Sequence, residues 1–203
     1  AGLALGATVI ATGIPFALFF PELLPLGGGL ALRLDALGAF FLVVIGIGAI
    51  PAALYGAGYT AAYKDGRASL PLLGAMFNLF LLTMSLVTLA DNVLTFLLMW
   101  EGMSLTSYFL VITESGEERV RNAGLWYIAM THAGLVMLLA AFLLLTGDAG
   151  SGAFADLRAS AASLTPGARD AVFVLAFLGF GSKAGIVPLH VWLPRAHPAA
   201  PSH

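Results

Sequence analysis

The stretch from Leu97 to Tyr108, LLMWEGMSLTSY, places one carboxylate in a run that otherwise avoids water. Glu101 stands nine residues after Asn92, which belongs to the polar connection before this run. At about 1.5 Å per residue that is roughly 13 Å, close to the middle of a bilayer core about 30 Å thick. A charge is most costly there, so an ionisable residue at this depth indicates function. The alternative is a neutral carboxylic acid that hydrogen-bonds a neighbouring helix.

The composition of the whole chain favours the same environment. Of 203 residues, 60% are hydrophobic and only 10% are charged, whereas soluble domains carry about 25% charged residues. The chain has no cysteine, which excludes disulfides and thiolate metal sites. Its net charge of −2 and the lack of a basic run argue against nucleic-acid binding. This composition predicts a protein whose solvent is lipid.

Six segments reach the length of about 20 mainly apolar residues that a transmembrane helix needs. They are continuously apolar and do not alternate, so we predict helices and not barrel strands. The longest connection, residues 147–169, is expected to contain a short interfacial helix. The predicted fold is an all-α integral membrane protein, a polytopic bundle that forms a single transmembrane domain over residues 1–203. Its expected helices cover residues 2–20, 36–57, 72–90, 92–112, 123–146 and 170–187.

The ends of the chain and its basic residues give two further expectations. The chain begins inside a hydrophobic run without Met and stops at His203 after a helix-breaking stretch, so we expect a piece of a longer protein. Basic residues in alternate connections fall into two groups, and the positive-inside rule predicts that the larger group is cytoplasmic. The smaller group is Arg33, Arg158 and Arg169, and the larger is Lys64, Arg67, Arg119, Arg121 and Arg195.

The sixth segment carries a second ionisable residue at membrane depth. Lys183 lies thirteen residues after Asp170, about 20 Å along a helix. Pro188 removes the N–H that would bond the carbonyl of Ala184, and three glycines lie nearby. We therefore predict a broken helix near Lys183–Pro188 beside a polar pathway. The alternative is that Lys183 snorkels from a helix end to the interface.

Two histidines are weaker candidates for the same site. His132, in YIAMTHAGLVM, lies about ten residues into its segment. A packing residue and a proton relay are equally good interpretations of it. The ordinary pKa of histidine is about 6.5, so both protonation states are accessible. His190 follows Pro188 and is expected to face the cytoplasmic mouth of the pathway. The chain has no glycine-rich phosphate loop, nucleophile elbow or zinc-ligand spacing, so we expect no cofactor and no metal.

Three stretches resemble one family. NVLTFLLMWEGMSLTSYFLV (residues 92–111) and GFGSKAGIVPLHVWLPRAHPAAPSH (residues 179–203) resemble paired signatures of the antiporter-like membrane subunits. Respiratory complex I, membrane-bound group 4 hydrogenases and Mrp cation/proton antiporters share these subunits. RLDALGAFFLVVIG (residues 33–46) is similar to the family segment two helices earlier. YIAMTHAG and the ending HPAAPSH are most similar to the large membrane subunit of hydrogenase-4 and formate hydrogenlyase.

The resemblance implies a fold of about fourteen helices with two inverted repeats, each holding a broken helix. The chain would then be the first half of that fold, without the opening helix. It implies a proton-translocating subunit of an energy-converting oxidoreductase complex, of the hydrogenase-4/formate hydrogenlyase or NADH–quinone oxidoreductase type. Such a subunit has no catalytic centre of its own. It works with other membrane subunits and a peripheral redox arm in a bacterial or archaeal inner membrane.

The resemblance also assigns roles to residues. Glu101 matches the family's glutamate on the fifth helix, and Lys183 matches its lysine on the broken seventh helix. They are implied to form a buried pair that moves protons or sodium ions, with His132 and His190 as candidate relays. Arg195 replaces the Asp of the family's WLPDAH motif, which we interpret as a surface variation. Two alternatives stay open, a subunit of a multisubunit Mrp-type cation/proton antiporter and a membrane scaffold that conducts nothing.

Overall fold

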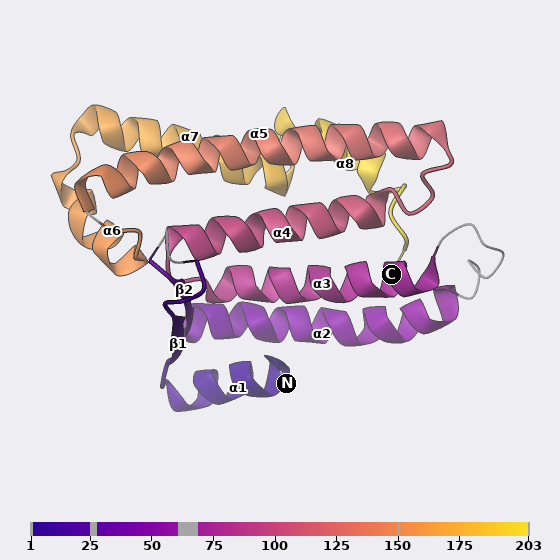
Figure 1. Ribbon diagram of the computed structural model, residues 1–203, viewed down its shortest axis with the longest axis horizontal. Helices are drawn as coiled ribbons and strands as arrows, with labels where there is room; N and C mark the ends of the chain where they lie inside the picture. Colours follow the sequence, from indigo (N-terminus) through magenta and orange to yellow (C-terminus); the bar gives the residue numbers. More distant parts are fainter. Residues whose placement is uncertain (1, 25–27, 61–68, 150, 203) are drawn as a thin grey trace.

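The computed structural model describes residues 2–24, 28–60, 69–149 and 151–202. Within these ranges, five helices are long and apolar enough to cross a membrane, and they lie side by side with alternating direction (Figure 1). The helical bundle predicted from the sequence is therefore confirmed. The five helices are α2 (Ala36–Tyr59), α3 (Leu70–Leu89), α4 (Val93–Val111), α5 (Glu118–Ala149) and α7 (Pro166–Ala184).

The prediction of one continuous helix over residues 2–20 is wrong. Helix α1 (Gly2–Thr12) has 11 residues, a rise of about 16 Å and only half of a bilayer core. It ends at Gly13, whose φ of +67° is left-handed and favours glycine. Strand β1 (Phe16–Phe20) follows and pairs antiparallel with β2 (Leu30–Leu34). The described chain thus has five crossing helices where the sequence predicted six, and a two-stranded hairpin interrupts the all-α fold.

Polar side chains begin α2 and α4 at the hairpin end of the bundle. The carboxylate of Asp35 accepts from the backbone N–H of Gly38 at 2.8 Å. Asn92 accepts from the N–H of Thr95 at 2.7 Å and donates to the carbonyl of Gly29 at 2.9 Å. These bonds satisfy helix N–H groups that have no partner inside the helix. They also attach the hairpin to the start of α4, the helix that carries Glu101.

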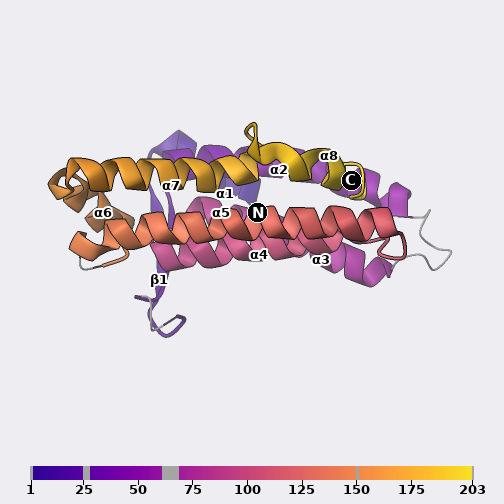
Figure 2. The same ribbon diagram turned by 90° about the horizontal axis from the view of Figure 1, so that it is seen from above.

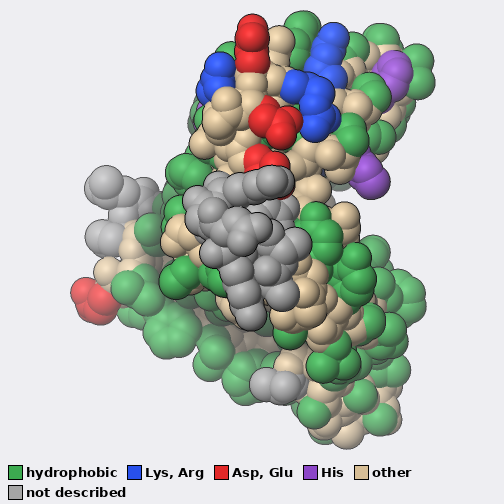
Figure 3. Space-filling model, turned by 90° about the vertical axis from the view of Figure 1, so that its right-hand side faces the viewer, with side chains coloured by type: hydrophobic (Ala, Val, Ile, Leu, Met, Phe, Trp, Pro, Cys, Tyr) green, Lys and Arg blue, Asp and Glu red, His purple; other side chains and the backbone are tan. Residues whose placement is uncertain are grey.

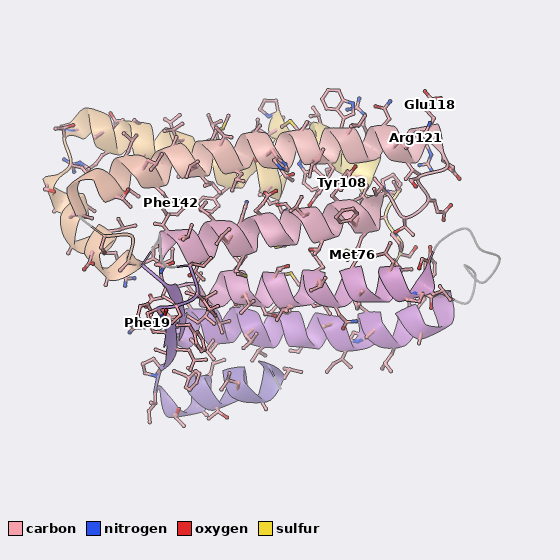
Figure 4. All side chains as sticks on the ribbon, viewed as in Figure 1. Phe19, Met76, Tyr108, Glu118, Arg121 and Phe142 are labelled. Atoms are coloured by element: carbon pink, nitrogen blue, oxygen red, sulfur yellow. The ribbon has the colours of Figure 1, made fainter. Side chains whose placement is uncertain are left out.

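The predicted short helix in the 147–169 connection is confirmed. Helix α6 (Phe154–Ser160) buries Leu157 and continues into the 3-10 turn η3 (Ala161–Ser163). The ring of Phe154 packs against Phe96 of α4 and Phe142 of α5, with centroids 6.2 and 6.1 Å apart. Figure 4 shows Phe142 near this end of α5. The aromatic contacts hold α4, α5 and α6 together at the hairpin end.

The described members of the two groups of basic residues lie at opposite ends of the bundle, as the charge pattern predicted. Arg33 and Arg158 line one cavity at the hairpin end, while Arg119 and Arg195 line another at the far end. Figure 4 places Glu118 and Arg121 at that far end, where Figure 3 shows charged side chains gathered above an apolar surface. Two members of the larger group, Lys64 and Arg67, lie outside the described residues.

The predicted break near Lys183–Pro188 is confirmed, and it begins at Gly185, three residues before Pro188. Helix α7 ends at Ala184 because Gly185 adopts a left-handed conformation, with φ of +73°. The chain then continues through η4 (Leu189–Trp192) and α8 (Leu193–Ala196). The indole N–H of Trp192 donates to the carbonyl of Ser182 at 2.7 Å. That bond satisfies a helix-terminal carbonyl that lipid could not satisfy.

Helices α5 and α7 lie against each other (Figure 2), and two glycines allow the close approach. A Cβ atom on Gly134 would collide with Ser182 Oγ and stand 3.0 Å from the carbonyl of Gly179. A Cβ atom on Gly179 would stand 2.6 Å from Leu138 Cγ. Small residues at a helix interface are the usual means of close packing in membranes. The contact fixes α7 against α5 one turn before Lys183.

Candidate functional site

Glu101 lies in the middle of α4 and faces α5. Its Oε1 is 3.0 Å from Nε2 of His132, and the side chains of Glu101 and His132 are 21% and 47% exposed. The other ring nitrogen, Nδ1 of His132, is 2.9 Å from the carbonyl of Ile128 one turn earlier. The second oxygen of Glu101, Oε2, is buried and has no hydrogen-bond partner in the described part of the chain.

Lys183, at the end of α7, points into the bundle. Its Nζ donates to Ser104 Oγ at 2.9 Å and to Tyr127 OH at 3.1 Å. The ammonium also lies 5.9 Å from the ring centroid of Trp100 and 5.4 Å from that of Tyr127, within range of cation–π attraction. Ser104 is fully buried, so Lys183 does not snorkel toward an interface.

The charge on Lys183 fixes the direction of a chain of hydroxyl groups. An ammonium only donates, so Ser104 and Tyr127 must accept from it and direct their own hydrogens elsewhere. Ser104 donates to the carbonyl of Trp100 at 3.0 Å, and the Tyr127 hydroxyl bonds to Ser107. If Lys183 lost its proton, it could accept from either hydroxyl. These bonds therefore respond to the protonation of Lys183.

The structure does not join Glu101 and Lys183 by a direct ion pair. Among the described residues, the carboxylate of Glu101 pairs with His132, while Lys183 bonds to hydroxyl groups. The reason is geometric, because α5 brings His132 to the carboxylate while Ser104 meets the ammonium one helical turn further along α4. The pair implied by the resemblance could act only through the electrostatic field across that turn.

The fourth candidate, His190, lies in η4 on the far side of the helix break. Its Nδ1 is buried without a hydrogen-bond partner among the described residues. The structure thus brings Glu101 together with His132 and places Lys183 against Ser104, one turn along α4 from Glu101. It does not bring His190 into hydrogen-bond contact with any of the other three candidates in the described chain.

A cavity of about 370 Å³ opens beside Lys183. Its polar wall is formed by Lys183, Tyr127 and Ser107, which share the hydrogen bonds described above, and by His197 after the helix break. The other walls are apolar side chains of α3, α4 and the segment after the break, among them Phe77, Phe80, Met103, Leu110 and Leu193. A water molecule needs two to four polar partners, so the polar wall is where water could stay.

Sequence reasoning missed four residues of this site, Trp100, Ser104, Ser107 and Tyr127. A signal existed for two of them, since residues 101, 104 and 107 recur every three positions and share one face of an apolar helix. Tyr127 gave no signal, because tyrosine in a membrane helix most often marks the interface.

The site consists of groups that can hold and pass protons. It combines a carboxylate, an imidazole, an ammonium and three hydroxyl groups, all of which hold or pass protons. Among the described residues, no group of three or more His, Cys, Asp or Glu side chains could hold a metal ion.

The sequence comparison places the chain in a family. Residues 90–203, more than half of the chain, match the family described as NADH:quinone oxidoreductase/Mrp antiporter, transmembrane. The matched region contains Glu101, His132 and Lys183. The chain therefore belongs to this family of antiporter-like membrane subunits, and it is a multi-pass membrane protein.

Two relatives show different degrees of similarity to the chain. The chain is 45% identical over 174 residues to "Hydrogenase-4 component B" of Escherichia coli (strain K12), a match covering 86% of this chain and 25% of that protein. It is 28% identical over 172 residues to the protein of Staphylococcus aureus (strain MRSA252) named as antiporter subunit mnhA2, covering 84% of this chain and 21% of that protein. The chain thus spans about a quarter of the length of these relatives.

Solved structures show the same fold. The membrane-bound sulfane sulfur reductase, an archaeal respiratory membrane complex, contains a chain that matches with a TM-score of 0.82 at 22% identity, covering 98% of this chain and 40% of that one. Respiratory complex I from Thermus thermophilus contains one with a TM-score of 0.74 at 26% identity, covering 96% and 40%. Both are multisubunit membrane complexes.

Proposed function

We propose that the chain is part of a proton-translocating membrane subunit of an energy-converting oxidoreductase complex, of the hydrogenase-4/formate hydrogenlyase or NADH–quinone oxidoreductase type. The identity of 45% to hydrogenase-4 component B, against 28% to the antiporter subunit mnhA2, supports this choice. Electron transfer would take place in a peripheral redox arm, and other membrane subunits would complete the complex in a bacterial or archaeal inner membrane. The subunit itself would hold no redox cofactor.

The observation that carries the proposal is the placement of half-buried Glu101 and Lys183 inside the described bundle without a direct bond between them. A charge at the bilayer centre costs at least about 2.5 kcal/mol. Two structural charges would neutralise each other in direct contact, which would lower that cost. Glu101 instead contacts His132, and Lys183 contacts hydroxyl groups. Each group can therefore gain or lose a proton without breaking an ion pair between the two, and proton transfer requires such changes.

The geometry supports a simple mechanism. A negative charge at Glu101 attracts the ammonium of Lys183 and holds its proton, and withdrawal of that charge favours release. Moving one charge across 100 mV costs about 2.3 kcal/mol. One unit of pKa corresponds to about 1.36 kcal/mol. A change of roughly two pKa units in the group that carries the proton therefore matches the cost of moving the charge. In this mechanism Ser104 and Tyr127 hold the ammonium in place while its charge changes.

The second candidate is a subunit of an Mrp-type cation/proton antiporter. The similarity to antiporter subunit mnhA2 extends over 84% of this chain, which favours a common ancestry of this half of the fold. Glu101 and Lys183 would serve both functions, so their mutation cannot separate the two. Purification of the intact complex can, because an oxidoreductase acidifies vesicles when given an electron donor, whereas an antiporter exchanges sodium for protons without one.

The test uses the full-length subunit in its complex, reconstituted into vesicles with a pH-sensitive dye. Glu101→Gln and Lys183→Met should each leave assembly intact and slow proton pumping at least tenfold, because both keep most of the packing but cannot change charge. Glu117→Gln is the matched control, since Glu117 forms an exposed pair with Arg119 at the bundle end. Normal pumping by correctly assembled Glu101→Gln and Lys183→Met complexes would refute the proposal.

A further inference from the structure

The tautomer of His132 follows from its neighbours. A backbone carbonyl can only accept, so the contact of 2.9 Å between Nδ1 and the carbonyl of Ile128 requires a hydrogen on Nδ1. The neutral ring would then have a bare Nε2. That nitrogen lies 3.0 Å from Oε1 of Glu101, a normal hydrogen-bond distance. Two bare acceptors would repel at this distance, so one proton must lie between them.

We infer that Glu101 and His132 form a proton-sharing dyad, and that the dyad is the counter-charge to which Lys183 responds. The inference rests on the proposed function, which it deepens by assigning the regulation of the same site. The shared proton can reside on Nε2, giving imidazolium and carboxylate, or on Oε1, giving imidazole and carboxylic acid. In both arrangements the net charge of the dyad is zero.

Release of the shared proton changes that charge. The N–H or O–H bond breaks, the proton passes to a water molecule, and a neutral imidazole and a carboxylate remain with a net charge of −1. No electron transfer is involved. Oε2 of Glu101 is buried without a partner among the described residues, which penalises a full negative charge. A positive Lys183 nearby offsets this penalty, so the empty dyad and the protonated lysine stabilise each other.

The charge near Glu101 depends on groups from two neighbouring helices. Among the residues that the structure describes, the titratable groups that interact with Glu101 are His132 and Tyr127 on α5 and Lys183 on α7, and α3 contains no titratable side chain. The net charge of the dyad therefore sets the electrostatic environment of Lys183. A loaded dyad gives Lys183 no net counter-charge and favours release of its proton, whereas an empty dyad retains it. Because His132 is 47% exposed and Glu101 only 21%, His132 is the more accessible member.

The direct test is nitrogen NMR on the full-length subunit in its complex, labelled with ¹⁵N-histidine and assigned by the signals lost in His132→Gln. The dyad predicts that Nδ1 of His132 carries a hydrogen, and that its Nε2 resonance lies between the protonated and bare positions. In Glu101→Gln, the glutamine amide can donate to a bare Nε2, so that resonance should move to the bare position. A wild-type ring with Nε2–H and bare Nδ1, or an Nε2 signal unchanged in Glu101→Gln, would overturn the inference.

A functional arm accompanies the spectrum. His132→Gln keeps the carboxylate of Glu101 but removes the shared proton, and it should slow pumping at least tenfold and change its pH profile between about pH 5 and 8. Glu117→Gln is the control, because Glu117 forms an exposed pair with Arg119 at the bundle end, away from the cavity; it should leave rate and profile within twofold of wild type. A His132→Gln complex with the wild-type rate and profile would overturn the regulatory role. If the wild-type complex pumps no protons, the proposed function fails while the NMR result still decides the dyad.

Discussion

Lys183 on α7 donates to Ser104 on α4 across 2.9 Å, one helical turn beyond Glu101. The lysine is therefore anchored by a neutral hydroxyl, while the carboxylate has a partner of its own. This arrangement separates binding of the ammonium from control of its charge. Hydrogen bonds hold Lys183 in either charge state, and the charge near Glu101 can change without loss of that contact.

The Tyr127 hydroxyl should matter for the rate of proton transfer. Tyr127→Phe keeps the ring beneath the ammonium but removes the acceptor at 3.1 Å and the link to Ser107. Hydrogen bonds to charged groups contribute about 1.5–3 kcal/mol, so we expect pumping to slow at least tenfold. Initial rates of vesicle acidification measure the effect.

Tyr108→Phe provides the control for this prediction. Tyr108 lies on α4 toward the far end of the bundle (Figure 4) and packs against Phe109 rather than Lys183. Its loss of a hydroxyl should leave the pumping rate within twofold. Equal rates in the Tyr127→Phe and Tyr108→Phe complexes would show that the hydroxyl next to Lys183 has no role in transfer.

The long helices and the break could be predicted because each depends on local sequence. Apolar length predicted α2, α3, α4, α5 and α7, and Pro188 together with the glycines around Lys183 predicted the break after α7. Hydropathy also explains the error over residues 2–20. Gly13 and Pro15 lie among apolar residues. The mean hydropathy over residues 2–20 is therefore high and does not reveal the turn between α1 and β1.

The contacts of the site could not be predicted in the same way. Depth in the membrane follows from counting residues, and it identified Glu101, Lys183 and His132. Partner choice depends on the rotation of α5 about its axis, which brings both His132 and Tyr127 toward α4. The rotation is accompanied by a close approach of α5 and α7 at Gly134 and Gly179, residues far apart in the sequence. No pattern within one segment reveals it.

The contact between α5 and α7 should be sensitive to a single methyl group. Gly134→Ala would place a Cβ atom against Ser182 and 3.0 Å from the carbonyl of Gly179, and overpacking costs about 1–3 kcal/mol. Gly147→Ala is the control on the same helix, because nothing lies within 4 Å of its Cβ position. Detergent-denaturation curves should show a lower unfolding free energy for Gly134→Ala only, and equal curves would contradict the packing.

The orientation in the membrane can be tested with single cysteines, since these 203 residues contain none. In a full-length chain without other cysteines, Ser115→Cys should react with an impermeant thiol reagent from the cytoplasmic side. Ser163→Cys, at the hairpin end beyond α6, should react from the outside. Both positions are exposed. The reverse labelling pattern would overturn the assignment that the positive-inside rule predicts.

The central claim, that Glu101 and Lys183 act as one unit, is tested most directly by a double-mutant cycle. Initial pumping rates are measured for the wild-type complex, Glu101→Gln, Lys183→Met and the double variant, all fully assembled. Residues that act together lose less in combination than the product of their separate losses. We predict that the double variant pumps about as fast as the slower single variant. A double variant slowed by the full product of the two single effects would show that the residues act independently and would contradict the account.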